Sequence, residues 1–74
     1  MMQIGMLWLD DDKKRSFDEK VRRAVDYYQD KYGRLPDLCF VNKAMLPQEK
    51  RVGKVNVHPA NHVMQHHFWL GVKA

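Results

Sequence analysis

The chain has 74 residues, enough for one small domain over residues 1–74, and such a domain buries only about 60% of the surface that its unfolded chain exposes. Its 45% hydrophobic and 11% aromatic residues favour a folded globule and exclude an intrinsically disordered chain. Cys39 is the only cysteine, which excludes an internal disulfide and predicts a reducing, cytoplasmic location.

The net charge of +4 is concentrated in the C-terminal part of the chain. Residues 1–42 contain eight Lys/Arg and eight Asp/Glu, whereas after Asn42 five Lys/Arg are opposed by Glu49 alone. All four histidines also follow Asn42. This basic segment, in a chain whose pI is near 9.4, predicts an acidic partner, for which nucleic acid is the most abundant candidate.

The first predicted element is a strand over residues 4–9. Its apolar run is nearly continuous and stops at Asp10, a pattern typical of a strand buried on both faces. The run is too short for a membrane span and has no basic leader, so we expect neither a signal peptide nor a membrane anchor.

The second predicted element is an amphipathic helix over residues 17–32. Ser16 and Glu19 have the spacing of a capping box at its start, and Gly33 suits its C-terminal cap. A helical period places six apolar or aromatic side chains on one stripe. They are Phe17, Val21, Ala24, Val25, Tyr28 and Tyr32.

Three further strands are predicted, over residues 38–42, 52–58 and 67–72. The one helix between the first two strands predicts a β-α-β unit with a parallel pair and a right-handed crossover. The alternating pattern of 52–58 indicates an edge strand, which we expect to pair with 67–72 as an antiparallel hairpin. The polar stretch 43–51 is predicted to be a loop.

The resulting fold class is α/β (α+β), with one amphipathic helix packed on a four-stranded sheet. The β-α-β unit comes first and the antiparallel β-hairpin is C-terminal. One helix covers only one face of such a sheet, so the other face needs a cover. A homodimer would supply it and would offset the small core.

Several classes of catalysis are excluded or disfavoured. The chain lacks threonine, and its only serine, Ser16, is assigned to the helix cap, so a hydroxyl nucleophile is not available. Cys39 lies in an apolar strand, where burial makes a thiol inert. No phosphate-binding glycine loop is present. We therefore favour a protein that is not an enzyme.

Two groups of residues are considered as metal ligands. Asp10 and Asp12 follow the first strand and could hold Mg²⁺. The alternative is that these carboxylates interact with the positive N-terminal end of the helix, while Lys13–Arg15 neutralise their excess charge. His58, His62 and His66 are spaced four apart and could bind Zn²⁺ together with Asp10 or Asp12. The alternative is that the histidines are ordinary surface or interface residues.

Basic and aromatic residues are interleaved in the C-terminal part, a composition typical of nucleic-acid surfaces. The alternative is that the cations keep the domain soluble and that Trp69 belongs to the core of the sheet. The residues expected to bind nucleic acid or another partner are Lys43, Lys50, Arg51, Lys54, His66, His67 and Trp69.

Three functional hypotheses follow from the sequence. The favoured one is a small cytoplasmic interaction module, homodimeric, whose basic aromatic surface contacts nucleic acid or an acidic protein. The second is a structural or accessory protein-interaction domain with no role in nucleic-acid binding. The third is a metal-dependent hydrolase that uses Asp10–Asp12 and the C-terminal histidines.

Overall fold

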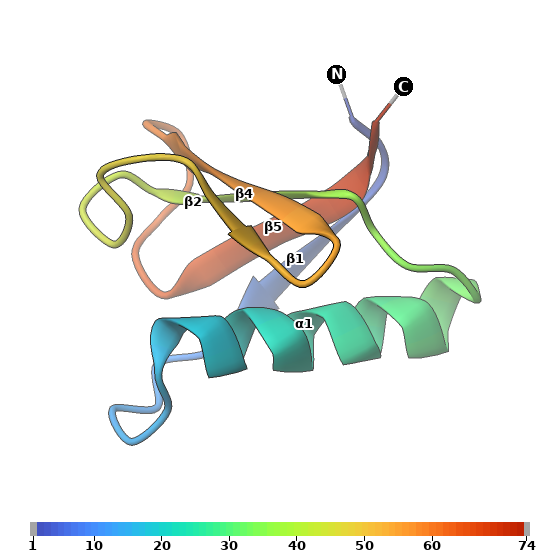
Figure 1. Cartoon of the computed structure of the whole chain (residues 1–74), viewed down its shortest axis with the longest axis horizontal. Coiled ribbons are helices and arrows are strands. Elements are labelled where there is room, and N and C mark those ends of the chain that lie inside the picture. The colour runs from blue at the N-terminus through green and yellow to red at the C-terminus, as the bar shows by residue number, and fades with distance from the viewer. Residues whose placement is uncertain (1, 74) are drawn as a thin grey trace.

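A computed structural model describes residues 2–73, with side chains from Gly5 onward, as one helix packed on a five-stranded mixed sheet (Figure 1). This confirms the predicted small α+β fold with a single helix. Among residues 2–73 no helix has the length and apolar character needed to cross a membrane. The elements are β1 (Met2–Leu9), α1 (Phe17–Tyr32), β2 (Leu38–Asn42), β3 (Lys50–Val52), β4 (Val55–Ala60) and β5 (His67–Lys73).

The last strand lies in the interior of the sheet, whose order is β1-β5-β2-β4-β3. β5 is antiparallel to both β1 and β2, so these two strands run in the same direction but do not pair. The strands of the predicted β-α-β unit are therefore parallel, as expected, but they do not form a pair, because β5 lies between them. The physical reason is the burial of Phe68 and Leu70, which are completely inaccessible. A strand in the interior of the sheet has a neighbouring strand on each side, and this position buries its side chains best.

The predicted C-terminal hairpin is also wrong, because β4 and β5 lie on opposite sides of β2. β4 pairs with β2 in parallel, and the observed hairpin joins β3 to β4. Gly53, at φ 59°, has the left-handed conformation that the tight turn requires, so the predicted strand 52–58 is divided in two. Only residues 43–49 of the predicted loop 43–51 remain outside strands.

The helix has the predicted bounds, for reasons that are visible at both ends. Ser16 Oγ accepts a hydrogen bond from the Glu19 amide at 3.2 Å. Gly33 is left-handed with φ 74°, and its amide donates to Gln29 O at 2.8 Å. The predicted apolar stripe faces the sheet, where Val21, Ala24 and Tyr28 are completely buried.

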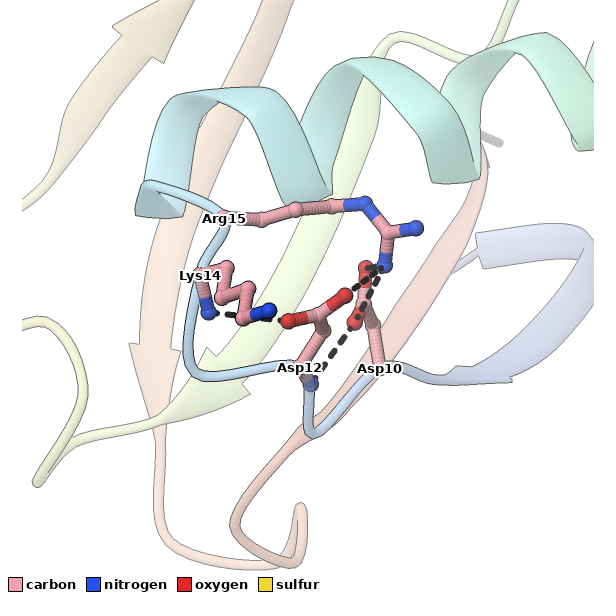
Figure 2. A network of polar contacts seen from close by, with 4 residues as sticks. All are labelled: Asp10, Asp12, Lys14 and Arg15. Atoms are coloured by element: carbon pink, nitrogen blue, oxygen red, sulfur yellow. Dashed lines mark hydrogen bonds and ion pairs between the residues drawn. The ribbon is translucent and has the colours of Figure 1, made fainter.

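The loop between β1 and α1 is held by a buried carboxylate, shown in Figure 2. Asp10 is only 7% exposed, and Arg15 Nη1 lies 3.3 and 3.4 Å from its two oxygens. Asp10 Oδ1 also accepts from the Asp12 amide at 3.1 Å, and Asp12 Oδ2 lies 3.2 Å from Arg15 Nη1. One guanidinium therefore compensates two carboxylates at the start of the helix.

We predict that Arg15→Met lowers the free energy of unfolding by about 1–3 kcal/mol, because the Asp10 carboxylate stays buried without its cationic partner. Urea unfolding followed by circular dichroism measures the change. Lys13→Met is the control, because it removes the same charge from an exposed neighbour. Equal stability losses in the two variants would contradict this role of Arg15.

Burial raises the pKa of the Cys39 thiol from 9.0 to about 12. Between those pH values the thiol ionises in the unfolded chain but stays protonated in the native state. The contribution of Cys39 to stability is therefore complete below pH 9 and is lost as the pH rises toward 12. The loss is at most about 1.4 kcal/mol per pH unit.

We predict that the stability difference between the protein and Cys39→Ala shrinks by about 1 kcal/mol between pH 9 and pH 10, because the unfolded-state thiol is only half ionised at pH 9. The alanine variant has no thiol to ionise. All other groups that ionise at alkaline pH are the same in both proteins, so the change in the difference reports the Cys39 thiol alone. Urea unfolding of both proteins at pH 7, 9 and 10 provides the measurement. A stability difference that does not change with pH would show that the thiol ionises equally in both states.

Candidate functional site

The face of the sheet away from α1, here called the outer face, has no helix against it (Figure 1). On the edge strand β1, Leu7 is 60% and Leu9 is 56% exposed. The prediction that this strand is buried on both faces is therefore wrong, because α1 covers only one of them. The outer face is thus an accessible surface that carries large apolar side chains.

A row of ring-bearing residues crosses the outer face. Strand register places Leu7 beside Trp69, Trp69 beside Phe40, and Phe40 beside His58, on β1, β5, β2 and β4. The Phe40 and His58 ring centroids are 5.7 Å apart with 35° between their planes. Trp69 is 40% exposed, so part of its indole is open to a ligand. We call Trp69, Phe40 and His58 the ring row.

Smaller and polar residues flank the ring row on both sides. Towards one end, register aligns Gly71, Leu38, Asn56 and Arg51 across β5, β2, β4 and β3. Towards the other end, His67 lies beside Leu9 on β1. The ring row therefore lies between these two rows of the outer face.

Gly5 determines how Trp69 lies on the sheet. A Cβ atom added at Gly5 would overlap Trp69 Nε1 and approach Cε2 and Cδ1 at 3.2 and 3.3 Å. The indole therefore rests directly on the backbone of β1, which only glycine allows at this position. This contact fixes one wall of the candidate site.

The four histidines occupy different environments. The ring centroids of His62 and Trp69 are 6.5 Å apart and nearly perpendicular, and His67 Nδ1 lies 2.9 Å from Gln65 O. His58 Nδ1 lies 3.1 Å from Glu49 Oε1. His66 has φ 66°, and its carbonyl accepts from the Asp10 amide in the turn before β5.

The residues proposed as metal ligands do not converge. Among residues 2–73 no three His, Cys, Asp or Glu side chains come close enough together to hold a metal ion. Asp10 and Asp12 are bonded to Arg15, and His58 is paired with Glu49. Through their bonds to Arg15, Asp10 and Asp12 hold the loop that leads into α1.

The predicted binding residues are divided between the two sides of the sheet. Arg51, His67 and Trp69 belong to the outer face, and Arg51 Nε donates to Gly53 O at 3.2 Å. Lys50 is directed to the helix side, where its Nζ lies 2.6 Å from Asp18 Oδ1. Lys54 lies at the β3–β4 turn, Lys43 follows β2, and His66 precedes β5.

Phe40 was not among the predicted site residues, and His58 was predicted only as a metal ligand. Phe40 stands between the buried residues Cys39 and Val41, so strand alternation alone places it on the opposite face. What the sequence does not contain is the strand order, which brings Phe40 between Trp69 and His58.

Comparisons with protein-family models, with curated proteins and with solved structures gave no significant match to this chain.

Proposed function

We propose that the protein is a binding module for single-stranded nucleic acid that uses the outer face of its sheet. The observation that carries the proposal is the ring row, in which Trp69, Phe40 and His58 lie side by side on three adjacent strands that α1 leaves uncovered. Adjacent strands are about 4.8 Å apart, so neighbouring rings can each contact a different base of an extended strand.

The shape of the surface favours single strands over a duplex. Reading a duplex requires an element that enters a groove, such as a helix or a two-stranded ribbon. A sheet face with exposed rings instead suits unpaired bases, which stack on aromatic side chains. The proposed ligand is therefore a single strand of DNA or RNA.

Charge supports the same ligand. Arg51 is exposed on the outer face, and Lys43 and Lys73 are exposed at the ends of β2 and β5. Seven of the nine carboxylates lie in α1 and the loop that precedes it. Of the other two, Glu49 is paired with His58, and Asp37 accepts a hydrogen bond from the Lys73 amide. Cations at the margin of the rings are positioned to contact phosphates of a strand lying across them.

A second candidate function is self-association through the outer face. Leu7, Leu9 and Met64 are 60%, 56% and 72% exposed and lie near Trp69, so a second copy could bury apolar surface here. In that case melting temperature would rise with protein concentration and oligonucleotides would have no effect.

We predict that Trp69→Ala weakens binding of a fluorescein-labelled, mixed-sequence nine-nucleotide single strand by about 1–3 kcal/mol, because it removes one stacking platform. Fluorescence anisotropy at low salt gives the affinity. Tyr27→Ala is the control, since Tyr27 is a comparably exposed aromatic residue of α1, at 47%. If Trp69→Ala binds as tightly as the control, the ring row is not the binding surface.

We predict that Arg51→Gln reduces the slope of log affinity against log salt by about 0.7, the contribution of one phosphate contact to a single strand. The slope is measured by the same anisotropy titration over a series of salt concentrations. Arg23→Gln, which removes an exposed charge from α1, should leave the slope unchanged. Equal slopes for the protein and Arg51→Gln would show that Arg51 does not contact a phosphate.

A further inference from the structure

A small hollow opens beside Trp69 at one end of the ring row. Its volume is about 120 Å³, and its lining comes from β1, β5 and the connection between β4 and β5. No carboxylate is among the lining residues, which favours a ligand group that is neutral or electron-rich. They are Leu7, His62, Val63, Met64, His67 and Trp69.

The walls of the hollow suit a flat ring. Trp69 supplies a planar wall whose position is fixed by its contact with Gly5. Val63 is buried, whereas Met64 is 72% exposed. An exposed methionine side chain is flexible and polarisable, so it can close over an aromatic ring placed against the indole.

His67 gives the hollow a defined hydrogen-bonding group. Its Nδ1 lies 2.9 Å from Gln65 O, and because a carbonyl oxygen can only accept, Nδ1 must carry the hydrogen. In the neutral imidazole the other nitrogen, Nε2, is then an acceptor. The contact with the Gln65 carbonyl thus selects the tautomer in which Nε2 can accept a hydrogen bond from a ligand.

We propose that this hollow receives one nucleobase that carries an exocyclic amino group, with the base against Trp69 and its amino group donating to His67 Nε2. Cytosine, adenine and guanine offer such a donor, whereas uracil and thymine place carbonyl oxygens on both sides of their one ring N–H. Those oxygens would face the lone pair of Nε2. This inference rests on the proposed function and adds a base preference to it.

The test compares oligo(dC) with oligo(dU), two nine-nucleotide strands whose bases have the same size. The bases differ at position 4, where cytosine has an amino group and uracil a carbonyl oxygen, and at the adjacent N3, which carries a hydrogen only in uracil. At pH 8 we expect oligo(dC) to bind about three- to tenfold more tightly, the effect of one additional hydrogen bond. His67→Phe keeps a ring but removes Nε2, so it should lose this preference. His67→Gln restores an acceptor and should recover part of it.

His66→Asn is the matched control, because it removes the neighbouring imidazole, which does not line the hollow, and asparagine tolerates the left-handed backbone there. It should retain the preference for oligo(dC). If both oligonucleotides bind equally to the unmodified protein, or if His67→Phe keeps the preference, the base assignment is wrong while single-strand binding stands. If neither binds, the proposed function fails as well.

Titration with 5′-CMP and 5′-UMP, followed at the Met64 methyl signal, separates a base within a strand from a free nucleotide. A shift with 5′-CMP that exceeds the shift with 5′-UMP supports the base assignment directly. If this happens although no oligonucleotide binds, the hollow belongs to free nucleotides and the single-strand function is overturned. If both mononucleotides shift the signal equally, the role of His67 as a discriminating acceptor is contradicted.

Discussion

The burial of one helix against one face of the sheet is the interaction on which the rest of the structure depends. α1 has sixteen residues, about 24 Å of helix, and its stripe of Val21, Ala24 and Tyr28 is fully buried. Since the described chain has no second helix, the opposite face keeps its side chains accessible. The presence of a single helix therefore has two consequences: it keeps the core small, and it leaves the outer face open as the candidate binding surface.

β5 links the core to that surface. Phe68 and Leu70 are fully buried on the helix side, while His67 and Trp69 alternate with them on the outer face. Its interior position places Trp69 between Leu7 and Phe40, and its start forms part of the hollow. Substitutions at alternate positions of one strand should therefore separate effects on stability from effects on binding.

The sequence predicts local structure better than strand order. The cap at Ser16, the apolar stripe and Gly33 define the helix completely, because these signals act over a few residues. The insertion of β5 between β1 and β2 depends on contacts between distant segments, which no periodicity records. The turn at Gly53 was missed because Gly53, Val55 and Val57 occupy alternate positions and so imitate one continuous strand. Trp69 was identified as a site residue, whereas Phe40 required the strand order.

The decisive experiment is to map a single-stranded oligonucleotide onto the protein by NMR. In a titration of labelled protein at low salt, we expect shifts at the indole of Trp69 and the rings of Phe40 and His58, with α1 unaffected. The shifts should reverse as salt is added. Shifts on the exposed side of α1, or a spectrum that does not change at all, would contradict the claim that the outer face binds single strands.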